Sequence, residues 1–80
     1  MKRSPDTFVL TTELGSRLRD LRLKAGLTQV ELARAMGRAG KSAGNLVSRL
    51  EKGDIPSVEL LIKMSEVFGK STDWILKGKE

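Results

Sequence analysis

The fold of this 80-residue chain is decided by residues 28–51, which read TQVELARAMGRAGKSAGNLVSRLE. Thr28 and Glu31 have the spacing of a capping box, in which each side chain bonds to the other residue's free backbone N–H. This pattern predicts a helix that starts at Thr28 and closes at Gly37. Ser42 is the expected cap of a second helix. The stretch therefore predicts two short helices joined by a glycine-containing connection.

The second of these helices has one polar and one apolar side. The polar side carries residues at positions i, i+3, i+4 and i+7, namely Asn45, Ser48, Arg49 and Lys52. The opposite side carries Val47, Leu50 and Glu51. Amide, hydroxyl and guanidinium groups read base edges in the major groove of DNA, and a basic helix of this length fits that groove. We therefore expect sequence-specific binding of double-stranded DNA.

Composition narrows the class of protein further. Fifteen Lys and Arg against ten Asp and Glu give a net charge of +5, which favours polyanionic partners, although a solvated surface explains the charge equally well. The chain has no cysteine and no histidine, so it lacks disulfides, cysteine-ligated zinc and the commonest general base. An enzyme is the class that the residues support least. No cofactor, metal or small-molecule ligand is expected.

No apolar run approaches the roughly 20 residues that a membrane span needs. We expect no membrane partner, and a cytoplasmic protein at the nucleoid.

Three more helices surround the central pair. The first is expected from a cap at Thr11 or Thr12 to Gly26, and its apolar stripe is Leu14, Leu18, Leu21 and Ala25. The fourth starts at Pro56 and Ser57, ends at Gly69, and has Val58, Leu61 and Phe68 inside. The fifth is capped by Ser71 or Thr72 and stopped by Gly78. Five helices with short connections predict a compact all-α domain over residues 13–78, preceded by an N-terminal arm over residues 1–12.

Two charged residues fall on stripes that are otherwise apolar. Arg22 lies four residues after Leu18 in the first helix, and Glu51 lies four residues after Val47 in the third. A lone buried charge costs several kcal/mol, so each needs a partner, and each is the other's best partner. The sequence favours a structural ion pair between Arg22 and Glu51 over two charges that reach solvent at the helix edges.

These residues resemble the lambda-repressor-like helix-turn-helix proteins, also called the Cro/cI or Xre family. The resemblance covers about residues 13–78 and is carried by GLTQVELARAMG at 26–37, VSRLEKG at 47–53, Pro56 with Ser57, and DWILKG at 73–78. It implies that the second helix crosses the phosphate backbone and that the third enters the major groove. It also implies that Gln29 contacts or supports contact with DNA, against the alternative of an exposed helix residue. Arg22 and Glu51 match positions that form a salt bridge in some phage repressors.

The chain departs from this family in the turn. Residues 37–42 are longer than the family's tight turn, and Gly44 falls where the family often places a base-contacting polar residue. The loop either grips phosphate through Arg38 and Lys41 or is a mobile solvated loop. Arg49 suits guanine and Asn45 suits adenine, although either residue could reach phosphate alone. The full set of expected DNA contacts is Thr28, Gln29, Arg38, Lys41, Ser42, Gly44, Asn45, Ser48, Arg49 and Lys52.

The fourth helix carries a second apolar stripe, formed by Leu60, Met64 and Val67. A homodimer that buries Leu60, Val67 and Trp74 accounts for this stripe, and so does a wider core contacted by Phe8, Val9 and Leu10. Lys2 and Arg3 either lie along DNA or are disordered.

The predicted function is a transcriptional regulator, a repressor that binds a palindromic operator as a homodimer. The alternatives are a helix-turn-helix scaffold that serves as a protein-interaction module, and an antitoxin.

Overall fold

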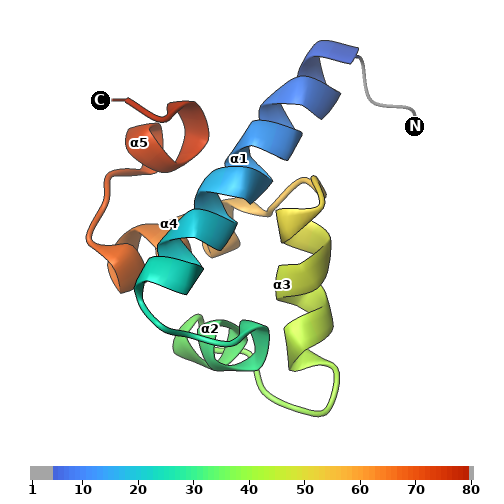
Figure 1. The fold of residues 1–80 in the computed structure, drawn as a ribbon, viewed down its shortest axis with the longest axis vertical. Helices are drawn as coiled ribbons and strands as arrows, with labels where there is room; N and C mark the ends of the chain where they lie inside the picture. The colour runs from blue at the N-terminus through green and yellow to red at the C-terminus, as the bar shows by residue number, and fades with distance from the viewer. Residues whose placement is uncertain (1–4, 80) are drawn as a thin grey trace.

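The computed structural model describes residues 5–79, with side chains described from Val9 onward, and contains five helices and no strand within that range (Figure 1). They are α1 (Pro5–Lys24), α2 (Gln29–Ala35), α3 (Ala43–Glu51), α4 (Val58–Phe68) and α5 (Thr72–Lys77). The predicted all-α domain of five helices is confirmed. None of the helices in these residues is both long and apolar enough to cross a membrane.

The long helix α1 runs through the middle of the molecule and separates two pairs of helices (Figure 1). α2 and α3 pack on one another at one side, and α4 and α5 pack on one another at the other. α1 contacts both α3 and α5. The core between the helices is apolar, and its largest fully buried side chains are Leu18, Leu32, Met36, Met64, Ile75 and Val47. α3 is therefore held on the same core that holds the rest of the domain.

Helix ends follow the capping residues in the sequence. The Glu31 backbone N–H donates to Thr28 Oγ1 at 3.1 Å, and the Thr28 N–H donates to Glu31 Oε1 at 2.8 Å, so the predicted capping box forms. Ser57 and Ser71 accept from backbone N–H groups in the first turns of α4 and α5. These bonds satisfy donors that the helix itself leaves unpaired.

The first helix begins earlier than predicted. α1 starts at Pro5 instead of at Thr11 or Thr12, so the segment expected to be an arm is helical from residue 5 onward. Proline suits the first turn of a helix because its missing N–H has no partner there and its φ is already helical. Thr11 is buried inside the helix instead of capping it. The expected roles of Lys2 and Arg3 lie outside the described residues.

The core side of α4 takes residues from both predicted apolar stripes. Leu60 is 5% exposed and Met64 is fully buried, whereas Val58, predicted to lie inside, is 73% exposed. Val67 is half-buried and packs against the core, together with Leu61 and Phe68. The prediction that Leu60 forms a dimer interface is therefore wrong, because its side chain is buried within one chain, whereas an interface at the half-buried Val67 stays a prediction. The wider core is not completed by Val9 and Leu10, which are both more than half exposed.

Candidate nucleic-acid interface

α3 presents its polar side chains to solvent and its apolar side chains to the core. Val47 and Leu50 are buried, while Asn45, Arg49 and Lys52 are exposed and Ser48 is half-buried. A shallow hollow runs along the outer side, lined by Ser42, Asn45, Leu46, Ser48, Arg49 and Lys52. Donors and acceptors that can read base edges are thus gathered on one helix face. We call this set of six residues the reading face.

The inner side of α3 is tied to α1 by an ion pair between Arg22 and Glu51. Arg22 Nε donates to Glu51 Oε2 at 2.6 Å and its Nη2 donates to Oε1 at 3.2 Å, with side chains that are 11% and 6% exposed. Arg22 Nη1 donates to the Leu27 carbonyl at 2.9 Å. The hydrogen bond to Glu51 raises the pKa of Arg22 above its ordinary value, although burial acts in the opposite direction. The predicted pair is present, and it fixes the last turn of α3 against α1.

Gln29, at the first position of α2, joins the same network. Its Nε2 donates to Glu51 Oε1 at 3.2 Å, so one carboxylate oxygen receives bonds from both Arg22 and Gln29. The side chain is half-buried, not a freely exposed helix residue. The amide is thereby positioned at the N-terminus of α2, where backbone N–H groups and the helix dipole favour an anion.

The connection between α2 and α3 carries two cationic residues, Arg38 and Lys41, next to the reading face. Gly37 and Gly40 adopt φ of +85° and +104°, which lets the chain turn sharply. Arg38 and Lys41 are exposed, and Arg38 Nη2 lies 4.0 Å from Glu59 Oε1. A second hollow, lined by Arg38, Ala39, Ser42, Ala43 and Leu46, shares two residues with the reading face. The loop and the reading face therefore form one continuous surface.

Ser42 occupies the N-cap position of α3 as predicted, but its hydroxyl makes no capping hydrogen bond. Its backbone has φ of −98° and ψ of 10° instead of the extended geometry of a capping residue. The hydroxyl is exposed on the reading face and is available to a ligand.

Gly44 does not belong to the reading face, although it was predicted to contact DNA. A Cβ at Gly44 would lie 2.9 Å from Val30 Cγ2 and 3.5 Å from the Val30 backbone nitrogen. The missing side chain points toward α2, and its absence lets α2 and α3 approach closely. Gly44 therefore serves the packing of α3 on α2, and no side chain at this position extends toward the reading face.

Gly15 is a structural residue that the sequence analysis missed. A Cβ at this position in α1 would lie 2.5 Å from the Leu50 carbonyl oxygen and 2.7 Å from the Glu51 carbonyl oxygen. The last turn of α3 thus packs directly on the α1 backbone. A glycine in a helix interior, where alanine is more stable by about 1 kcal/mol, was the available signal.

Comparison with known proteins agrees with this geometry. The profile of the helix-turn-helix family matches residues 18–75, which include α2, α3 and all the expected DNA contacts. The chain belongs to the lambda-repressor-like helix-turn-helix family. No solved structure matches it. As a member of the helix-turn-helix family, the protein is a DNA-binding regulator, with α2 and α3 as its two motif helices.

Proposed function

We propose that this helix-turn-helix protein is a transcriptional repressor that binds a palindromic operator as a homodimer. The observation that carries the proposal is the division of α3 into an outer side with Asn45, Ser48, Arg49 and Lys52 and an inner side fixed to α1. A rigid helix with its donors already oriented loses less entropy when it binds. The domain is thus built to place one polar helix face into a major groove.

The donors and acceptors of each side chain suit a particular contact with DNA. Arg49 suits bidentate bonding to guanine O6 and N7, and Asn45 suits adenine N6 and N7. Ser48 and Ser42 supply hydroxyls that can bond to bases or phosphates. Positioning contacts to phosphate are assigned to Thr28, Gln29, Arg38, Lys41 and Lys52.

Binding to duplexes selected from a random library tests the proposal. Replacing Arg49 with alanine should cost about 1 to 3 kcal/mol on the selected site and relax preference at one base pair. Lys52→Ala, at the C-cap of the same helix, is the matched control, because losing a phosphate contact should weaken binding to all sequences alike. Log affinity should also fall steeply with log salt. Binding that is indifferent to salt and sequence would instead support a protein-interaction module.

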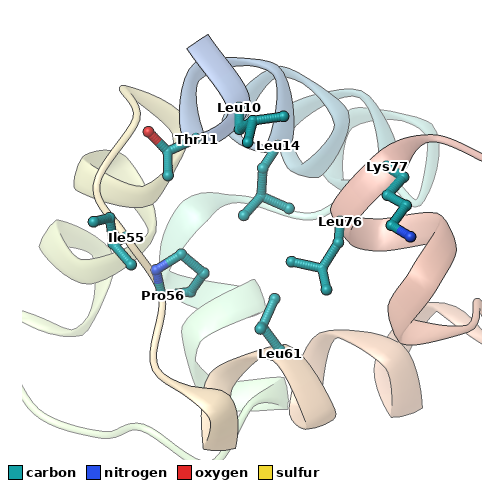
Figure 2. A pocket seen from close by; sticks show the side chains of 8 residues that line it. All are labelled: Leu10, Thr11, Leu14, Ile55, Pro56, Leu61, Leu76 and Lys77. Atoms are coloured by element: carbon teal, nitrogen blue, oxygen red, sulfur yellow. The ribbon is translucent and has the colours of Figure 1, made fainter. Parts of the chain in front are cut away.

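The homodimer requires a surface that does not include the buried Leu60. An apolar hollow of about 300 Å³ lies between the N-terminal half of α1, the connection from α3 to α4, and α5 (Figure 2). Leu10 and Ile55 are both 57% exposed at this hollow, and Leu76 is 38% exposed. Trp74, also predicted at the interface, is half-buried with Lys70 Nζ 4.8 Å from its ring centroid. We assign the dimer contact to this hollow and a second copy of the chain as its occupant.

The size of the domain and the place of the hollow support a second copy. The hollow is lined by Ile55 and Pro56, which lie in the connection after α3, so a dimer contact there is close in sequence to the end of the reading helix. The domain measures 32 by 29 Å in its two longer dimensions, so two touching copies have centres about 30 Å apart. Successive major grooves on one face of DNA are about 34 Å apart. The size of such a dimer is thus compatible with two half-sites one helical turn apart.

Molar mass in solution tests this surface. Leu10→Gln or Ile55→Gln should shift the protein toward monomer in sedimentation equilibrium and weaken binding to the full palindrome more than to a half-site. Leu23→Gln is the matched control, because Leu23 lies on the same helix as Leu10, is 54% exposed and is outside the hollow. A parent protein that stays monomeric, or a Leu23→Gln variant that loses the dimer equally, would remove this assignment and leave DNA binding by α3 intact.

A further inference from the structure

We propose that Asp54 is a specificity-determining residue that holds the Arg49 guanidinium ready for guanine and makes non-specific DNA binding less favourable. The inference rests on the proposed function, since it concerns how the same reading face discriminates between sequences. It begins from one ion pair at the end of α3, where Arg49 Nε lies 4.0 Å from Asp54 Oδ2.

The backbone fixes Asp54 beside Arg49. The chain leaves α3 through Lys52 and Gly53, and the Asp54 N–H donates to the Arg49 carbonyl at 3.0 Å. Gly53 has φ of +112° and packs on α1, where an added Cβ would lie 3.2 Å from Thr12 Oγ1. The Asp54 carboxylate is therefore a neighbour held by the fold, although its side chain is 53% exposed.

The atoms involved suit a supporting role. The carboxylate faces Nε, the inner edge of the guanidinium, and leaves both Nη groups at the tip for a base. Bidentate recognition of guanine needs a planar fork with a defined direction. An unrestrained arginine, with a side chain that is 67% exposed here, has many rotamers and can equally reach a phosphate. A carboxylate on the inner edge favours the rotamers that point the fork along the groove.

The charge of Asp54 has a second effect. A carboxylate beside the reading face repels every phosphate backbone, whatever the base sequence. When the helix enters the groove and water leaves, the attraction between Asp54 and Arg49 strengthens because the effective dielectric constant falls. Arg49 bonded to guanine keeps this partner, whereas Arg49 drawn to a phosphate loses it. The pair thus lowers affinity for DNA in general more than it lowers affinity for the correct site.

A control pair of the same kind exists on the same protein. Arg38 and Glu59 are also 4.0 Å apart and exposed, but Glu59 lies on α4 and Arg38 is assigned to phosphate. Neutralising Glu59 should raise affinity for all sequences alike and leave sequence preference unchanged. Neutralising Asp54 should raise affinity for random DNA and reduce preference.

The experiment compares Asp54→Asn, Arg49→Ala, the double variant and Glu59→Gln with the parent. Each binds three probes by fluorescence anisotropy at fixed salt: the duplex that the parent selects, the same duplex changed at the base pair where Arg49→Ala relaxes preference, and a random duplex. Asp54→Asn should lower the preference for the selected duplex over the changed one about two- to fivefold, the range of coupling measured for exposed ion pairs. In the Arg49→Ala background it should have no further effect on preference. Its melting temperature should match that of the parent.

Three results would overturn the inference. Asp54→Asn could keep the parent's preference, could reduce preference equally without Arg49, or could behave like Glu59→Gln on all three probes. In each of these cases the parent still discriminates, so the proposed function stands. A parent that shows no preference among the probes would overturn the proposed function and this inference together.

Discussion

Replacing Gly15 with alanine should destabilise the domain, although helix propensity alone predicts the opposite. Alanine is favoured over glycine by about 1 kcal/mol inside a helix. Against this gain, the new methyl would lie 2.5, 2.7 and 2.9 Å from three backbone atoms of Leu50 and Glu51, where ordinary contacts begin near 3.4 Å. Backbone cannot rotate away, so α3 has to move from α1 and strain its other contacts. We expect a net loss of about 1 to 3 kcal/mol from a total stability of about 4 to 12 kcal/mol.

Gly44→Ala is the matched control for this substitution. Both glycines lie in helices and neither has positive φ, but the methyl at Gly44 meets the tip of the Val30 side chain at 2.9 Å. A side-chain tip can move, so this substitution should change stability by less than about 1 kcal/mol. Urea unfolding followed by circular dichroism measures both changes in stability. In thermal unfolding, the same loss for Gly15→Ala should lower the melting temperature by about 5 to 20 °C. A Gly15→Ala protein as stable as the parent would refute the close packing of α1 on the end of α3.

Three more predictions follow from contacts described above. Arg22→Met or Glu51→Leu alone should lower the free energy of unfolding in urea by about 3 to 5 kcal/mol, because the remaining buried charge loses its partner. The double variant should recover much of this loss. Single variants that unfold like the parent would contradict the ion pair. The hydrogen bonds of the capping box lower the pKa of Glu31 below its ordinary value of 4.5. The stabilisation that ionised Glu31 gives to the fold is therefore complete above pH 4.5 and is lost as the pH falls through the folded-state pKa. Glu31→Gln should therefore flatten the acid side of the stability profile, and an unchanged profile would count against the bond. The double substitution of Arg38 and Lys41 by alanine should reduce the slope of log affinity against log salt by about 1 to 2. The melting temperature and the site preference should stay constant, because phosphate contacts carry no sequence information. An altered site preference would instead place the loop in a groove of the DNA.

The parts of the fold that sequence could predict are those set by neighbours in the chain. The capping box at Thr28 and Glu31 and the serine caps of α4 and α5 depend on residues three positions apart, so their patterns are visible directly. The Arg22–Glu51 pair was also accessible, because two isolated charges on apolar stripes require partners. These features place the five helices and orient α3.

The missed features depend on contacts between helices. α4 carries two apolar stripes, and only its packing on the rest of the domain, including α5, selects Leu60 and Met64 for the core over Val58. Gly15 is required by the backbone of α3, and Gly44 faces the Val30 side chain of α2, so the contact that each makes depends on how the helices pack. Asp54 is adjacent in space to Arg49 because the chain turns back at Gly53, so its place beside the reading face was not evident from spacing along α3.

α3 uses different residues for folding and for its outward surface, and this division affects how such a protein can come to bind a different DNA sequence. Val47, Leu50 and the Glu51 side chain lie on the inner side of α3, whereas Asn45 and Arg49 are exposed. Exchanges at solvated positions usually alter stability by less than about 0.5 kcal/mol. Mutation can therefore explore different outward side chains while the domain continues to fold, and a library randomised at the outward positions should yield folded proteins with diverged operators. On the proposed function, the helix that selects the operator also leaves this choice open to change by mutation.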